Sequence, residues 1–514
     1  MIADLLVRGG TVHDGTGAEP IRADVAVRDG RIDAIGDGLC GEGEAARVLD
    51  ATGLVVAPGF IDIHSHSDDT LLLDPRAVSA IHQGVTLEVV GNCGHGCFPI
   101  RDVERARRAI YGYADAHLLT WSSAAGYFAA LEEARPAVNV LSLVPNGQLR
   151  LSVVGLEDRP ATKPELAEMS RLLEESLDQG AWGYSTGLEY AQERGAPEQE
   201  LTALSRVAAL HGGLYATHTR KRDAGAAEAV EEAVRTARDA GARLQVSHLV
   251  PRSGEEEAHR CLAAVEAGAR DGLDLAFDMH TRLYGTTFLQ TALPPHALGA
   301  GPEELRTLLA SRSAREEMKR YESILSAGGD WSRIVVLDND VEPGAGRRDI
   351  ASIAAEQGVE PLDAVYDLLA AALPDPSRLM VLILCYTEER QREAFAHPLC
   401  TPGSDATTLA PDGVLAGSTF HGAYTWASWF YRFMVRQERA LTPAEAVHRL
   451  TGAPAARLGL RDRGVLRVGA WADVAVFDHD RFGERGTTFE PNQLAEGMRH
   501  VVVNGVVTLD GGVR

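Results

Sequence analysis

The stretch "LVVAPGFIDIHSHSDD", residues 54–69, runs an apolar segment directly into two histidines, His64 and His66. Side chains at positions i and i+2 of a strand point to the same face, so the two imidazoles would project together while Ser65 points away. Only 17 histidines occur among 514 residues, which makes a pair at the end of a hydrophobic run notable. Paired imidazoles at the end of a strand predict a metal site.

The composition excludes several classes of function. With 45% hydrophobic and 24% charged residues, a chain of this length can bury a large core and should be soluble and globular. A net charge of −23 opposes binding to nucleic acid or to anionic lipid. The sequence shows no secretion signal and no run that approaches the ~18 apolar residues of a membrane span. We therefore expect a cytoplasmic protein that binds neither nucleic acid nor membrane.

Both ends of the chain have the pattern of short strands. Residues 1–58 contain alternating apolar runs separated by Asp-Gly and Gly-Gly turns, and residues 465–514 return to the same pattern, with Asn504-Gly505 as a hairpin signal. We expect the two ends to form one β-sandwich together.

Residues 59–464 alternate strand-like runs with helical patterns, of which residues 163–180 and 224–241 are the clearest. This alternation is typical of βαβ units, and about eight units predict an α/β fold, a (β/α)8 TIM-like barrel. Nine candidate strands can be counted, one too many; the last two are "RLMVLILC" (378–385) and "LCTPGSDA" (399–406). Pro-Pro and Gly-Gly turns interrupt the alternation of strands and helices, so we expect an insertion in a barrel loop at about residues 285–350.

Four more residues follow apolar runs in the way that His64 and His66 do: Cys93, His218, His248 and Asp405. In a barrel, residues at strand ends collect at the C-terminal face, where active sites are built. A single histidine at a strand end is more often a core residue, but six such positions in order favour a shared site. Imidazoles, a thiolate and a carboxylate form a ligand set for one or two zinc ions.

The sequence resembles the amidohydrolase superfamily and, within it, the D-aminoacylase (N-acyl-D-amino-acid deacylase) group. The resemblance lies in "PGFIDIHSHSDD" (58–69), "QGVTLEVVGNCG" (83–94), "GYSTGLEY" (183–190), "ATHTR" (216–220), "VSHL" (246–249) and "GSDA" (403–406). It implies that His64 and His66, with Asp405, face one metal position. It also implies that Cys93, His218 and His248 hold the other, with Cys93 able to bridge the two.

This resemblance implies the hydrolysis of a small-molecule amide, an N-acyl amino acid or a related compound. Zinc lowers the pKa of a bound water toward ~7, which supplies hydroxide at neutral pH. Asp405 would take the proton of this water and pass it to the departing nitrogen. Tyr190 would help to stabilise the oxyanion of the tetrahedral intermediate.

The substrate side departs from the D-aminoacylase pattern. Val250 stands where that group has a lysine, and His421-Gly422 stands where it has a Pro-Arg pair. In the D-aminoacylase pattern, the lysine and the arginine hold the substrate's α-carboxylate. The remaining candidates for substrate binding are Tyr190, Arg252, Arg282, His421 and Tyr424. We therefore expect a substrate that lacks a free α-carboxylate, unless these arginines replace the missing cations.

Three alternatives remain at this stage. A cyclic-amide hydrolase of the same superfamily would use a carboxylated lysine between the metals, but the only lysine between His66 and His218 is Lys163, at an apparent helix start. A deaminase would keep the metal chemistry and break a different bond. A non-catalytic barrel scaffold would be expected to have lost ligands, whereas this chain keeps six. The sequence is compatible with a homo-oligomer and with either one or two metal ions.

Overall fold

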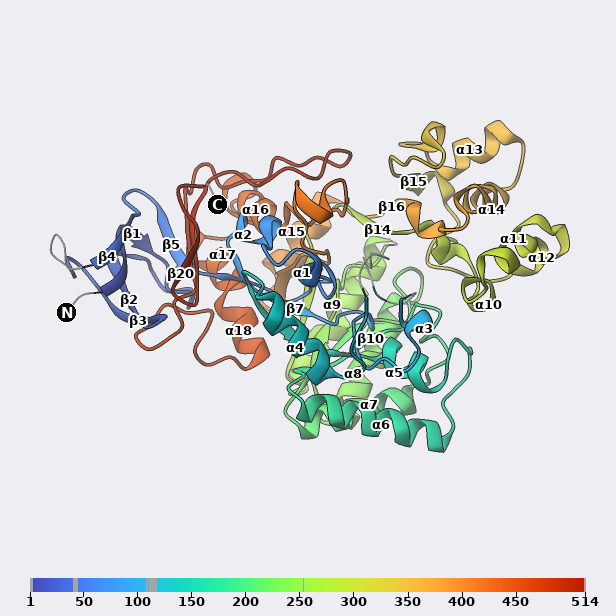
Figure 1. Cartoon of the computed structure of the whole chain (residues 1–514), viewed down its shortest axis with the longest axis horizontal. Coiled ribbons are helices and arrows are strands. Elements are labelled where there is room, and N and C mark those ends of the chain that lie inside the picture. Colours follow the sequence, from blue (N-terminus) through green and yellow to red (C-terminus); the bar gives the residue numbers. More distant parts are fainter. Residues whose placement is uncertain (1–2, 40–44, 108–109, 111–117, 253, 513–514) are drawn as a thin grey trace.

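The computed structural model describes residues 3–39, 45–107, 110, 118–252 and 254–512. The molecule is elongated, with a β-sheet at one end, a central α/β region and a smaller part, coloured yellow to orange, at the other end (Figure 1). No helix in the described ranges is long and apolar enough to cross a membrane.

Strands from both chain ends share one sheet, in the order β20-β19-β18-β5-β1-β2-β3, with β4 paired to β1. Its core includes Val25, Val56 and Val474, so the two ends bury one another's apolar side chains. The predicted hairpin lies between β19 and β20, where Asn504 and Gly505 both have the positive φ that a type I′ turn requires. The eight strands are β1 (Ala3–Val12), β2 (Ile21–Arg28), β3 (Arg31–Gly36), β4 (Ala45–Asp50), β5 (Val55–Pro58), β18 (Val474–Phe477), β19 (Met498–Val503) and β20 (Val506–Leu509).

The central region contains two parallel sheets, β6-β7-β8 and β9-β10-β11-β12-β13-β17. One residue, Leu143, separates β8 from β9, and a parallel bridge between Ser65 and Ala406 links the segments that follow β6 and β17. The last strand of the series, β17, is therefore linked back to the first, β6, through the residues that follow them. The strands are β6 (Phe60–Asp62), β7 (Val85–Val90), β8 (Asn139–Ser142), β9 (Val144–Pro145), β10 (Gly183–Gly187), β11 (Leu214–His218), β12 (Arg243–Val246), β13 (Leu275–His280) and β17 (Cys400–Gly403).

Helices connect these strands, and the two clearest sequence patterns form the predicted helices. At α6, Thr162 and Glu165 make a capping box, and α8 ends at Gly241 in the left-handed conformation. The helices of this region are α1 (Thr70–Leu73), α2 (Val78–Ile81), α3 (Val103–Arg107), α4 (Ala124–Ala134), α5 (Asn146–Val153), α6 (Lys163–Asp178), α7 (Glu198–Leu210), α8 (Ala226–Ala240), α9 (Glu255–Arg270), α15 (Glu388–Ala396), α16 (Trp426–Tyr431), α17 (Pro443–Leu450) and α18 (Gly452–Leu458).

The segment between β13 and β17 forms a separate unit with its own core and an antiparallel sheet of β14, β16 and β15. The unit extends from Tyr284 to Leu384, beyond the predicted end near residue 350, because β16 pairs with both β14 and β15. The candidate strand at 378–385 is therefore β16, and it is the extra strand of the sequence count. The elements are β14 (Tyr284–Phe288), α10 (Pro295–Leu298), α11 (Pro302–Ala310), α12 (Arg312–Met318), β15 (Ile334–Val336), α13 (Ile350–Gln357), α14 (Pro361–Ala372) and β16 (Met380–Leu384).

Candidate metal centre and substrate cavities

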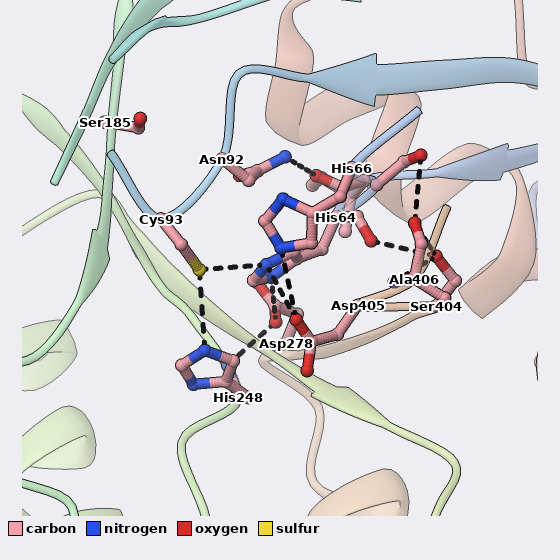
Figure 2. A network of polar contacts seen from close by, with 12 residues as sticks. His64, His66, Asn92, Cys93, Ser185, His248, Asp278, Ser404, Asp405 and Ala406 are labelled. Atoms are coloured by element: carbon pink, nitrogen blue, oxygen red, sulfur yellow. Dashed lines mark hydrogen bonds and ion pairs between the residues drawn. The ribbon is translucent and has the colours of Figure 1, made fainter. Parts of the chain in front are cut away.

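Four of the six predicted ligands form one compact group: His64, Cys93, His248 and Asp405 each offer an atom within 4.8 Å of the others. The Sγ atom of Cys93 lies 3.2 Å from Nε2 of His64 and 3.6 Å from Nε2 of His248. Figure 2 shows the thiol between the two imidazoles, with Asp405 beside them. Residues from four strand ends thus meet at one point, as the sequence pattern predicted.

The backbone at this group is strained. Cys93, His248 and Asp405 all have positive φ, at 52°, 35° and 45°, although none is a glycine. Such conformations cost of order 1–3 kcal/mol each and persist where the surrounding structure enforces them, commonly at functional sites. These turns aim the three side chains at one another directly after β7, β12 and β17.

His218 lies beside the group, and its ring centroid is 4.6 Å from that of His248. Its Nε2 lies 2.8 Å from Oε2 of Glu189, whereas its buried Nδ1 has no hydrogen-bond partner in the described part of the chain. A metal-binding histidine usually donates its other ring N–H to a carboxylate, which fixes the tautomer. This arrangement leaves Nδ1 of His218 as the donor atom for a metal.

Glu189 is itself held by a buried arginine. Its Oε1 lies 2.5 Å from the Arg252 guanidinium, which also contacts Asp223 at 2.8 Å, and the Arg252 side chain is 3% exposed. The chain Arg252–Glu189–His218 was not predicted. The motif "GLEY" contains Glu189, but only its neighbour Tyr190 was predicted to act at the site.

Asp278 is a second residue that the sequence analysis missed. Its Oδ1 lies 2.9 Å from Nδ1 of His64 and accepts a hydrogen bond from the backbone N–H of His248. The contact directs Nε2 of His64 toward Cys93. A signal was present, since Asp278 and His280 alternate at the end of the apolar run of β13, as His64 and His66 do after β6.

The imidazoles of the group differ in protonation. Burial lowers the pKa of His66, His218 and His248, which keeps these imidazoles neutral, the form that binds a metal. At His64 burial acts in the same direction, but Cys93 and Asp278 outweigh it and raise the pKa well above its usual value, so this imidazole must lose a proton to bind a metal. Burial raises the pKa of the Cys93 thiol, so a thiolate there needs a cation beside it. The buried Nδ1 of His218 and this donor set fit a zinc ion.

Asp405 connects the group to His66 and Arg282. Its Oδ1 lies 3.3 Å from Nε2 of His66, and its Oδ2 accepts a hydrogen bond of 2.9 Å from Arg282. Burial opposes ionisation of Asp405, but the His66 hydrogen bond and the charges of His64 and Arg282 outweigh it, so its pKa lies well below the usual range. The carboxylate is ionised and firmly oriented.

Two cavities are lined by residues that contact the predicted ligands, although no predicted ligand lines either of them. One, of about 870 Å³, is lined by Arg252, Arg282, His421 and Trp429 among others. The other, of about 780 Å³, is lined by His95, Glu189 and Tyr190 together with residues of the inserted unit. Tyr190 lies close to the predicted ligands, with its ring centroid 4.9 Å from that of His218 and its ring tilted against it.

The other predicted substrate residues differ in their placement. Arg252 and Arg282 reach the first cavity, but their charges are already paired with Glu189 and Asp223 and with Asp405. His421 lines the same cavity, and burial lowers its pKa to about 4. Tyr424 is fully buried in an apolar cluster and is not among the described residues that line either cavity, so it packs the core instead of facing substrate.

Comparison with known proteins identifies the family of this chain. The model of the amidohydrolase family matches residues 47–509. The chain belongs to the amidohydrolase family. This amidohydrolase is 34% identical over 508 residues to N-acyl-D-glutamate deacylase of Alcaligenes xylosoxydans xylosoxydans, which covers 98% of this chain and 93% of the relative.

Two solved structures are similar to this amidohydrolase over nearly its whole length. One is a crystal structure of N-acyl-D-glutamate deacylase from Bordetella bronchiseptica, complexed with zinc and a phosphonate mimic of the tetrahedral intermediate. It is 31% identical, with a TM-score of 0.81, and the match covers 99% of this chain and 96% of that one. The other is a structure of D-aminoacylase, from work on the functional role of its binuclear metal centre. It is 29% identical, with a TM-score of 0.81, and the match covers 98% of this chain and 96% of that one.

Proposed function

We propose that this amidohydrolase is a zinc-dependent deacylase of N-acyl amino acids or closely related amides. The observation that carries the proposal is the buried group in which Sγ of Cys93 lies between Nε2 of His64 and Nε2 of His248. The relatives named for deacylation of N-acyl-D-glutamate support the same reaction. The enzyme hydrolyses a C–N bond of a linear amide.

We assign the central strands, from β6 to β17, to a closed (β/α)8 barrel. The return of the pairing order through the bridge between Ser65 and Ala406 supports closure. Residues 1–58 and 465–514 then form the β-sandwich region, and residues 59–464 form the barrel, with residues 284–384 inserted after β13. We also assign the enzyme to the cytoplasm.

The ligands fall into two sets that share Cys93. His64 and His66, with Asp405, would hold one position, and Cys93, His218 and His248 the other. The distances of Cys93 to a histidine of each set support a bridging thiolate. A bound zinc ion would polarise the scissile carbonyl and lower the pKa of a water.

The remaining steps follow from residues of the chain. Asp405 accepts a proton from the attacking water and returns it to the amide nitrogen as the C–N bond breaks, which yields a carboxylic acid and an amine. Arg282 holds Oδ2 of Asp405, so the carboxylate cannot rotate away. The phenol of Tyr190 donates a hydrogen bond to the carbonyl oxygen as negative charge develops there.

We further propose that the substrate lacks a free α-carboxylate. The positions Val250 and Gly422 provide no cation, and the charges of Arg252 and Arg282 are already paired. Arg333 and Arg390 also line the first cavity, so they are the arginines that could replace the missing cations. A carboxylate without its partner loses ~1.5–3 kcal/mol, about ten- to more than a hundredfold in kcat/KM. The test compares an N-acyl amino acid with its methyl ester, in both enantiomers. Strong preference for the free acid would contradict this part of the proposal.

A cyclic-amide hydrolase with a carboxylated lysine is not supported. Lys163 is exposed at the first turn of α6 and makes no contribution to the group around Cys93. The deacylase proposal itself is tested by metal analysis of the purified protein, followed by release of free amine from N-acyl amino acids before and after chelation. A zinc-loaded protein that releases no amine from any of them would refute it.

A further inference from the structure

The cavity of about 780 Å³ lies between the loops of the metal centre and the inserted unit. Its inner wall is formed by His95, Glu189 and Tyr190, and Thr407, two residues after Asp405, also lines it. None of the six predicted ligands lines this cavity, but Glu189, which does, contacts the predicted ligand His218. A substrate held at the metal centre would have this cavity beside it.

Apolar and polar side chains both line this cavity, and the polar ones include Arg107, Gln192 and Arg378. The inserted unit contributes Phe288, Leu298 and Ile324, and the segment after β17 contributes Leu409 and Phe420. Cavities of ~300–1,000 Å³ typically enclose drug-sized ligands, so an acetyl group would fill only a small part of this one. The apolar part of the lining, which comes from both the inserted unit and the segment after β17, fits an extended hydrocarbon chain.

The positions of Tyr190 and Asp405 decide which half of the amide enters this cavity. Tyr190, which the proposed mechanism places beside the carbonyl oxygen, lines this cavity. Asp405, which returns the proton to the nitrogen, is held by Arg282, and Arg282 lines the other cavity together with His421 and Gly422. The acyl half therefore points toward Tyr190 and the inserted unit, and the amine half toward Arg282.

We infer that the enzyme is selective for amides with a medium-chain fatty acyl group, of about eight to twelve carbons, which binds between the inserted unit and the barrel loops. This inference rests on the proposed deacylase function and specifies its acyl half. Each buried methylene raises kcat/KM about fourfold, so the six additional methylenes of an octanoyl group raise it at most about 4,000-fold over an acetyl group. We expect kcat/KM for the N-octanoyl derivative to exceed that for the N-acetyl derivative of the same amino acid by at least about 100-fold.

The test uses the zinc-loaded full chain and a series of N-acetyl, N-butanoyl, N-octanoyl and N-dodecanoyl derivatives. Ile324→Trp fills part of the cavity and should lower the octanoyl-to-acetyl ratio of kcat/KM at least about tenfold. Val359→Trp is the matched control, because Val359 is an exposed residue of the same inserted unit that lines neither cavity among the described residues. This control should keep the ratio. A wild-type preference for acetyl, or an unchanged ratio in Ile324→Trp, would overturn the assignment.

A binding measurement separates this inference from the deacylase proposal. Dodecanoate, the acyl product, should bind the zinc-loaded wild type at least about 100-fold more tightly than acetate in calorimetry. Equal affinities would overturn the inference even if amides are hydrolysed. Tight dodecanoate binding by a protein that releases no amine would instead refute the reaction and retain the acyl site.

Discussion

Replacing Glu189 with glutamine should weaken zinc binding while the fold is kept. Glu189 lies 2.8 Å from Nε2 of His218, so the proposed ligand assignment gives Nδ1 of His218 to the metal. The side-chain amide introduced by Glu189→Gln is neutral and can present either its oxygen or its NH2 group to the imidazole. Both tautomers of His218 then become accessible, and only one of them can use Nδ1 as a ligand.

The size of the effect follows from the contacts. Loss of a residue that orients a metal ligand typically costs 10–100-fold in metal affinity, about 1.4–2.7 kcal/mol. Breaking a buried ion pair can cost ~3–5 kcal/mol of stability, but Arg252 keeps its contact with Asp223 in the variant, so the loss should be smaller. The variant should therefore fold and bind zinc weakly.

The assay is competition for zinc between the protein and a chromophoric chelator, with circular dichroism to check folding. Glu200→Gln is the matched control, because Glu200 forms a buried ion pair with Arg150 outside the metal centre, with side chains 3% and 0% exposed. It should lower stability by a similar amount and leave zinc affinity unchanged. The reasoning is refuted if Glu189→Gln binds zinc as tightly as wild type, or if both variants weaken zinc binding equally.

Two further changes test the metal centre, and a third tests Glu193, a buried carboxyl group that accepts hydrogen bonds from Asn146 and from the backbone N–H of Gly187. Cys93→Ala should remove most of the bound zinc in elemental analysis, since a thiolate is the softest ligand of the set; full zinc content would exclude the bridging role. Asp405→Asn should lower kcat by on the order of 10²-fold or more, because an amide cannot carry the proton; an unchanged kcat would remove Asp405 from the reaction. Burial raises the pKa of Glu193 from 4.5 to about 7, so the stability linked to its protonated form is complete below pH 4.5 and is lost as the pH rises through 7. Urea unfolding at pH 4 and pH 8 compares the free energy of unfolding of Glu193→Gln with that of wild type. The advantage of the variant should be ~3 kcal/mol larger at pH 8 than at pH 4. An equal dependence on pH in both proteins would contradict this.

The order of the strands and the candidate ligands were predictable because both depend on local patterns. An apolar run followed by a histidine, cysteine or aspartate marks the end of a parallel strand, and parallel strands present their ends at one edge. The strand count was wrong in the inserted unit, because α13, α14 and β16 repeat the helix–strand spacing of the barrel. Only the antiparallel pairing of β16 with β14 and β15 assigns that segment to a different sheet.

The pairing of charges was decided by the tertiary structure. Arg252 and Arg282 look like free cations in the sequence, but the fold brings Arg252 to Glu189, 63 residues away, and Arg282 to Asp405, 123 residues away. The sequence by itself placed imidazoles, a thiol and a carboxylate at the ends of strands, because the periodicity of a strand is set by nearest neighbours. Which group holds each ligand, and which cations remain for a substrate, depends on contacts between distant segments, and local periodicity carries no information about those.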